Sequence, residues 1–268
     1  MFKRRYDANM KQAMQSALIW IVGIALIVLL FFVMAFFSII LYPFDRKRKV
    51  AHAQCFWWAD AVTALNPYWK VTINGLENIE HHKTYVVVSN HQSLADIVLI
   101  YKTKMQFKWV AKDSLFKIPL LGWNMRLAKH IRLEREDFSS IRRVYREAGK
   151  WLRNGVSVVF FPEGTRSDNH EMGIFQNGAF KLAIKEKVPI LPIVIKGTKN
   201  AIPKGSWRFT TRISCVIKVL SPIDTSGLLA HDFVRLRELA RARLSNGADN
   251  CRAPSEQPFQ QAQLFKEW

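Results

Sequence analysis

Cysteine and acidic residues are scarce in this chain of 268 residues. The three cysteines, Cys55, Cys215 and Cys251, are scattered, so they match neither a metal-binding spacing nor a disulfide framework. This usage fits a reducing compartment. Asp and Glu total 21 against 40 Lys and Arg, a formal net charge of +19. Such a surplus favours anionic partners: phospholipid headgroups, phosphorylated substrates, acidic carrier proteins or nucleic acid.

Charge is absent altogether from one long stretch. Residues 17–42 run for 26 positions without a charged side chain. A helix of that length would measure roughly 39 Å, enough to cross a hydrocarbon core of about 30 Å with tilt. A signal peptide would have a shorter apolar core and a small-residue cleavage site, and a core helix of a soluble domain is rarely this long. We therefore predict a basic segment at 1–16 and a membrane segment at 17–42.

Basic residues flank this segment on both sides, at 3–11 and at 46–49. Because Lys and Arg mark the cytoplasmic side, the pattern fits either a single span or a hairpin that keeps both flanks on the cytoplasmic face. Residues 43–69 form a basic, aromatic segment that predicts either an interfacial helix on the bilayer or a helix packed on the following domain. The 9 Trp and 18 Phe favour a membrane over nucleic acid as the anionic partner.

Residues 70–245 alternate short apolar runs with helical patterns. Strands are predicted from the apolar runs at 71–73, 85–88, 107–111, 156–161, 188–196 and 212–220, and helices at 97–101, 138–153, 178–187 and 232–244. This alternation predicts an α/β domain with a largely parallel sheet. The polar residues 246–268 predict a loose C-terminal tail.

A polar turn at 89–93 separates the second predicted strand from the next helix. It contains His91, and Asp96 follows five positions later. Open α/β folds place ligands at such turns, and a histidine oriented by a carboxylate can take a proton from a hydroxyl. The alternative is structural: Ser93 fits a helix N-cap, and Asp96 would favour the positive end of the helix dipole. The catalytic pairing requires His91 to fold back outside the helix.

A second polar turn, residues 162–167, follows the predicted strand at 156–161. Gly164 allows the backbone to approach a ligand closely. Thr165 offers a hydroxyl, and Arg166 presents a planar fork suited to phosphate oxygens. Glu163 can bond a substrate hydroxyl or hold Arg166 in place. The alternative is a strand-end turn with a surface salt bridge of little energetic value.

Together the two turns, Asn-His-Gln-Ser-x-x-Asp at 90–96 and Phe-Pro-Glu-Gly-Thr-Arg-Ser at 161–167, resemble the glycerolipid acyltransferase family. The resemblance is strongest to bacterial-type 1-acyl-sn-glycerol-3-phosphate acyltransferases, and it covers residues 70–220. It implies a glycerol-3-phosphate acyltransferase-like domain. The implied reaction moves a fatty acyl chain from acyl-CoA or acyl carrier protein to the free hydroxyl of lysophosphatidic acid, giving phosphatidic acid. No metal and no bound cofactor are implied.

The resemblance also implies roles for particular residues. His91 would be the general base and Asp96 its orienting partner. Lys112 and Arg166 would bind the phosphate of the acceptor. The residues that would bind the acceptor as a whole are six: Lys112, Arg135, Glu163, Gly164, Thr165 and Arg166. The implied location is a membrane, with the catalytic domain on its cytoplasmic face.

Two features depart from the family pattern. Gln176 stands where the family often has lysine, and His130 lies in a segment that usually contains glycine. They bear on the acceptor's identity, so a related acyltransferase acting on another lysophospholipid or an aminolipid stays an alternative. A non-catalytic basic membrane-binding protein is an alternative of a different class, but it leaves His91 and Asp96 unexplained.

Overall fold

The computed structural model describes residues 2–41, 43–66, 69–166, 172–199, 201, 207, 209 and 213–251. Its α-helices are α1 (Phe2–Ile40), α2 (Lys49–Ala64), α3 (Ala95–Tyr101), α4 (Asp113–Phe116), α5 (Leu121–Leu127), α6 (Phe138–Arg153), α7 (Gly178–Glu186) and α8 (Phe233–Asp249). Its strands are β1 (Trp69–Asn74), β2 (Val86–Ser89), β3 (Phe107–Lys112), β4 (Ile131–Leu133), β5 (Ser157–Phe160), β6 (Ile190–Lys196) and β7 (Ile213–Val219).

The strands form one sheet in the order β1-β7-β6-β2-β5-β3-β4. The five strands from β6 to β4 run parallel to one another. Strand β7 is antiparallel to β6, and β1 pairs parallel with β7, so two strands at one edge are reversed. The predicted α/β domain with a largely parallel sheet is therefore confirmed. Strand β2 lies in the middle of the sheet, which is why its valines have no exposed face.

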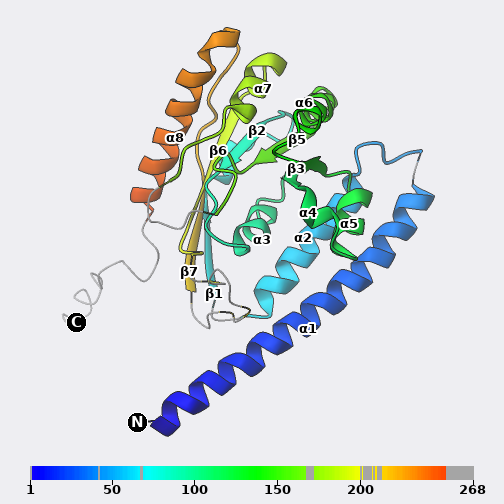
Figure 1. Ribbon diagram of the computed structural model, residues 1–268, viewed down its shortest axis with the longest axis vertical. Coiled ribbons are helices and arrows are strands. Elements are labelled where there is room, and N and C mark those ends of the chain that lie inside the picture. Colours follow the sequence, from blue (N-terminus) through cyan, green and yellow to red (C-terminus); the bar gives the residue numbers. More distant parts are fainter. Residues whose placement is uncertain are drawn as a thin grey trace, which may run out of the picture.

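Helices cover both faces of the sheet, giving three layers (Figure 1). Successive residues of β2 face opposite layers, as the period of a strand requires. Val87 packs in the core beneath α2 and α3, whereas Val86 and Val88 pack in the core beneath α6, α7 and α8. The central strands are thus buried from both sides, and polar residues lie where these strands end.

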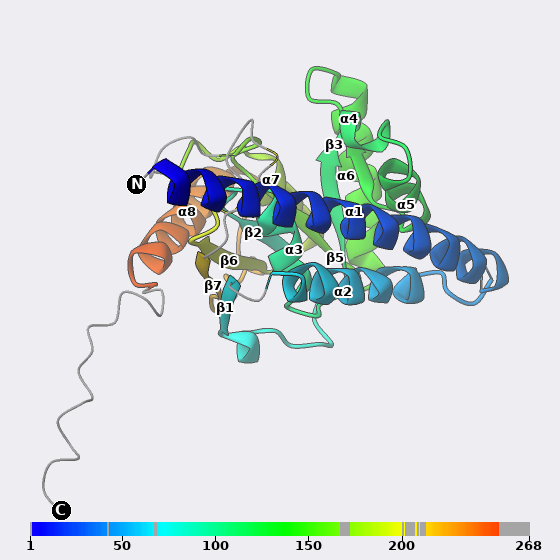
Figure 2. The same ribbon diagram turned by 90° about the horizontal axis from the view of Figure 1, so that it is seen from below.

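Helix α1 is continuous through residues 17–40 of the predicted membrane segment, and the basic segment at 1–16 belongs to the same helix from Phe2 onward. The chain reverses only after Ile40, and α2 returns alongside α1 (Figure 2). Because α1 has no turn between Phe2 and Ile40, the predicted alternative of a hairpin within the membrane segment is wrong, and the helix pair α1–α2 is a separate feature. Met10–Ile40 is long and apolar enough to cross a membrane. Many of its large apolar side chains are exposed, including Ile21, Phe32 and Ile39.

Helix α2 packs on the following domain, which is the second of the two alternatives for the segment at 43–69. Phe56 and Trp58 pack against the core of the α/β domain, so this helix is attached to the domain. Trp57 points outward and is largely exposed.

Two predicted boundaries are wrong. Trp69 is the first residue of β1 and belongs to the sheet, because it pairs with Ile213. The predicted tail begins too early, since α8 extends to Asp249 and buries Leu244 and Gly247 against the domain. The rest of the predicted tail, residues 252–268, lies outside the described residues.

Candidate active site

Both polar turns lie at the carboxyl ends of adjacent parallel strands. The first follows β2 and the second follows β5, and these strands pair directly. Asn90 fixes the first turn, because its side-chain oxygen accepts from the Ile195 amide at 2.8 Å and its amide nitrogen donates to the Ile195 carbonyl at 2.7 Å. The turn is therefore tied to β6. His91 projects from the carboxyl ends of the strands, where α/β folds bind ligands.

His91 folds back over the start of α3, as the catalytic pairing requires. Its Nδ1 lies 2.8 Å from Oδ2 of Asp96. The same oxygen accepts from the backbone amides of Gln92 at 2.6 Å and Ser93 at 2.8 Å. Asp96 is fully buried. Its carboxylate thus closes the turn and orients the imidazole at once, so the structural and catalytic interpretations of Asp96 are compatible.

The predicted N-cap is displaced by one residue. Helix α3 starts at Ala95, with Leu94 in the N-cap position and no side-chain cap bond there. Ser93 contributes a weaker bond, accepting from the Ala95 amide at 3.4 Å. Asp96 has taken over the capping role, because it accepts from two amides ahead of the helix.

Glu163 links the two turns. One of its carboxylate oxygens accepts from the backbone amide of His91 at 3.1 Å, and the other accepts from the amide of Gly173 at 2.9 Å. The side chain is nearly buried. These contacts stand beside the two predicted for Glu163, with a substrate hydroxyl or with Arg166. They show Glu163 holding the backbone of the general-base candidate in place.

Arg135 reaches the second turn from the loop after β4. Its Nη2 donates to the carbonyl of Gly164. Gly164 has a φ of +74°, a conformation in which a residue with a side chain would be strained. The sequence indicated that Gly164 lets the backbone approach a ligand closely. The conformation of the turn also requires a glycine at this position. Lys112 ends β3, which pairs with β4 at Leu133, and its side chain is exposed.

A large cavity, here called the central cavity, opens at these turns. Its volume is about 970 Å³. Seven of the eight predicted site residues line it, and the eighth, Asp96, lies beneath His91. The seven are His91, Lys112, Arg135, Glu163, Gly164, Thr165 and Arg166. The structure therefore brings all predicted site residues together.

Other lining residues were not identified from the sequence. Phe161 stacks on the imidazole of His91, with ring centroids 4.0 Å apart. The signal for it was its place as the first residue of the second motif, at the end of an apolar strand. A further set comes from α1, α2 and α5, far away in sequence, and no local pattern marked it: Ile27, Leu30, Met34, Gln54, Cys55, Trp58, Leu121, Asn124 and Met125.

Uncharged polar groups lie at the inner end of the central cavity, which is the end next to α1 and α2. Nδ1 of His130 accepts from the backbone amide of Trp109 at 3.2 Å, and its Nε2 lies 3.4 Å from the Tyr101 hydroxyl. Burial keeps the pKa of His130 well below its usual value and raises the pKa of Tyr101 well above its own. Both side chains are neutral near pH 7, so they offer hydrogen bonds without charge.

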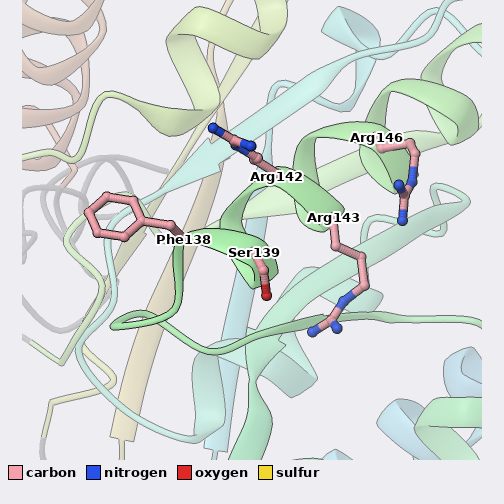
Figure 3. A pocket seen from close by; sticks show the side chains of 5 residues that line it. All are labelled: Phe138, Ser139, Arg142, Arg143 and Arg146. Atoms are coloured by element: carbon pink, nitrogen blue, oxygen red, sulfur yellow. The ribbon is translucent and has the colours of Figure 1, made fainter.

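A second, smaller hollow of about 540 Å³ lies on α6 and is lined by arginines (Figure 3). Arg142 and Arg146 are exposed, and Arg143 is half-buried and donates to the Ser140 hydroxyl at 3.0 Å. Phe138, at the start of the helix, is largely exposed beside them. This surface combines positive charge with an aromatic ring and suits an anionic, amphipathic partner.

The geometry of the central cavity suits general-base chemistry on a hydroxyl. A carboxylate at Nδ1 selects the tautomer in which Nδ1 carries the proton, which makes Nε2 the basic atom. Cationic side chains at the same opening can hold a phosphate. Among the residues described, no cluster of His, Cys, Asp or Glu has the make-up of a metal site.

Comparison with known proteins places this geometry in a family. A family model described as Acyltransferase matches residues 70–196. The 1-acyl-sn-glycerol-3-phosphate acyltransferase of Chlamydomonas reinhardtii is 39% identical over 178 residues, which are 66% of this chain and 53% of that protein. The mouse (Mus musculus) 1-acyl-sn-glycerol-3-phosphate acyltransferase alpha is 34% identical, over 64% of this chain and 61% of that protein. The chain thus spans about half the length of the first of these relatives.

A solved structure matches over nearly its whole length. The crystal structure of the 1-acyl-sn-glycerophosphate (LPA) acyltransferase PlsC from Thermotoga maritima aligns with a TM-score of 0.65 and 30% identity. The alignment covers 86% of this chain and 96% of that one, so it includes helices outside the family-model match. With the same fold, the paired motifs and this identity, the chain belongs to the glycerolipid acyltransferase family.

Proposed function

We propose that this protein transfers a fatty acyl chain from a thioester donor to the free hydroxyl of lysophosphatidic acid, giving phosphatidic acid. The observation that carries the proposal is the His91–Asp96 pair, which opens on the same cavity as Lys112, Arg135 and Arg166. The relatives named for this activity support it.

The reaction uses His91 as a general base. Nε2 takes the proton of the acceptor hydroxyl as its oxygen attacks the carbonyl carbon of the thioester. Asp96 stabilises the imidazolium that forms. When the tetrahedral intermediate collapses, the carbon–sulfur bond breaks and the imidazolium returns the proton to the leaving thiolate. A base positioned in this way contributes about 10²- to 10⁴-fold to the rate.

The two substrates occupy different parts of the central cavity. The phosphate of lysophosphatidic acid docks on Lys112 and Arg166 at the opening, beside the turn that Arg135 supports. The acyl chain of the donor enters between α1, α2 and α3, where the lining includes Ile27, Leu30 and Met34. Burying a hydrocarbon chain there is favourable by roughly 25 cal/mol per Å².

The protein acts at a membrane, with its catalytic domain on the cytoplasmic face. Helix α1 carries the apolar surface for this attachment. The net charge of +19 and the arginines of α6 favour anionic lipids and anionic donors, acyl-CoA or acyl carrier protein alike. Activity on anionic vesicles is therefore expected to fall as salt is raised, and binding insensitive to salt would contradict this electrostatic part.

The decisive experiment measures acyl transfer by the full chain in mixed micelles containing lysophosphatidic acid and a long-chain acyl-CoA. The native protein is expected to make phosphatidic acid, and His91→Ala is expected to lose at least about 10²-fold in kcat. Equal activity of the two proteins would refute the role of His91.

Alternative acceptors are tested in the same assay. Competition by other lysophospholipids or by an aminolipid would identify a different acceptor, as the departures at Gln176 and His130 allow. Gln176 and His130 both line the central cavity, so acceptor choice can depend on them. If no acceptor is acylated with either acyl-CoA or acyl carrier protein as donor, the enzymatic proposal fails.

A further inference from the structure

The central cavity has an outer and an inner end. Its outer end lies at His91 and Lys112, where β2 and β3 finish. From there it follows one side of α3, which presents Leu94, Ile97 and Tyr101 to it. The seven steps from Leu94 to Tyr101 span about 10 Å along a helix axis. The inner end therefore lies well away from His91, next to the helices α1 and α2.

The inner end contains a buried amide that nothing in the protein satisfies. Gln54 of α2 is only 2% exposed and lines the cavity. Within the described part of the chain, neither its side-chain nitrogen nor its side-chain oxygen has a hydrogen-bond partner. Burying such a group without a partner is unfavourable. An apolar residue would fill this place in the fold at lower cost, so the amide is unexplained by stability.

Two neighbouring groups share this property. Trp58 lies one helical turn after Gln54, and its indole nitrogen is buried without a partner among the residues described. In α5, the side-chain oxygen of Asn124 is also buried and unpartnered in that part of the chain, while its nitrogen donates to the Ile27 carbonyl at 3.4 Å. All three side chains line the central cavity. The lining of this cavity thus carries two unpartnered donors, on Gln54 and Trp58, and two unpartnered acceptors, on Gln54 and Asn124, among the residues described.

We propose that this inner end is a hydrogen-bonding subsite for an acyl chain that carries an oxygen substituent, a hydroxyl or oxo group. The inference rests on the proposed function, because the donor's acyl chain must occupy the cavity. A hydroxyl is both donor and acceptor, so it can satisfy the Gln54 amide on either side. Trp58 and Asn124 supply the remaining contacts. A plain hydrocarbon chain would leave all of these polar atoms unsatisfied in its presence.

The experiment compares acyl-CoA donors of one chain length in the lysophosphatidic acid assay. One donor is unsubstituted, and the others carry a single hydroxyl moved stepwise along the chain. At one position, far from the thioester, kcat/KM is expected to exceed that of the plain donor by about five- to tenfold, the value of one neutral hydrogen bond. Gln54→Leu is expected to abolish the preference while still transferring plain chains.

Gln106→Leu is the matched control, because Gln106 lies outside the cavity and donates to the Lys47 carbonyl. It is expected to retain the preference for the hydroxylated donor. Since the Gln54 amide makes no bond in the described protein, Gln54→Leu is also expected not to lower Tm.

Two results would overturn the inference: transfer of plain and hydroxylated chains at equal rates by the native protein, or a preference that survives in Gln54→Leu. Either would leave the proposed function standing, since plain chains would still be transferred. Absence of transfer from every donor would instead remove the proposed function, and the subsite with it.

Discussion

The phenyl ring of Phe161 lies flat against the imidazole of His91, with centroids 4.0 Å apart and planes inclined by 12°. Trp109 stacks on Phe161 in turn, at 5.3 Å. The Trp109 indole donates to the Tyr101 hydroxyl at 2.9 Å, which ties this stack to the inner end of the cavity. His91 is therefore fixed along its edge by Asp96 and over its face by Phe161. The second motif positions the base of the first.

Replacing Phe161 tests this positioning. An aromatic contact of this kind contributes about 0.5–1.5 kcal/mol. Phe161→Leu is therefore expected to lower kcat up to about tenfold while KM for lysophosphatidic acid changes little. Phe161→Tyr keeps the ring and is expected to restore the rate. Steady-state kinetics with Tm as a folding control decide the question. An unchanged kcat in Phe161→Leu would show that the stack is only packing.

Asp96→Asn isolates the charge of the orienting carboxylate. The asparagine oxygen can still accept from the amides of Gln92 and Ser93, so the turn is expected to keep its shape. The stabilisation of the imidazolium is lost, and kcat is expected to fall by about 10²- to 10⁴-fold. The measurement is kcat in both proteins, with circular dichroism to verify the fold. Activity near the native level would mean that Asp96 serves only as a helix cap.

Arg166→Ala probes phosphate recognition. A bond between a guanidinium and an anion contributes about 1.5–3 kcal/mol, so KM for lysophosphatidic acid is expected to rise by at least about tenfold. An uncharged monoacylglycerol should lose nothing, because it has no phosphate. Arg235→Ala, an exposed arginine on α8, is the matched control and should leave both values unchanged. Equal losses with both acceptors would contradict a phosphate role for Arg166.

His52 makes the stability of the fold depend on pH. Burial, together with the charge of Lys108, lowers the pKa of His52 to about 3. Above about pH 6.5 the imidazole is neutral in both folded and unfolded chains and adds no dependence. Below that pH only the unfolded chain takes up the proton, so stability falls as the pH drops toward 3. At pH 5 this amounts to roughly 2 kcal/mol from His52.

Thermal unfolding in detergent between about pH 7 and pH 5 measures this effect. His52→Gln retains an acceptor for the Phe107 amide, which donates to His52 at 3.4 Å, but it does not titrate. The variant is expected to lose less Tm on acidification than the native protein. Buried His130 shifts in the same direction, so part of the acid dependence should remain. Identical acid profiles for native and variant would refute the assignment to His52.

Elements with strong local patterns were predicted well from the sequence. Helix α6 has the predicted bounds, Phe138–Arg153, because its apolar residues recur at helical spacing and Gly155 follows its end. The valine run of β2 has no polar position, which is the pattern of a strand buried on both faces. The predicted end at 245 was wrong because the surface of α8 is polar, whereas its buried stripe continues to Gly247.

The two motifs, and the chemistry proposed for them, were identified from the sequence alone, since each lies on one turn after one strand. Which strands are neighbours is a matter of long-range pairing, and only the tertiary structure decided it. Pairing of β2 with β5 brings Glu163 to the His91 amide, although they are far apart along the chain. The reversed direction of β1 and β7 could not be predicted either, because an apolar run has the same pattern in a parallel and an antiparallel strand. The cavity's inner wall arises only when α1 and α2 pack on the domain, and so the unsatisfied amide of Gln54 became visible only there.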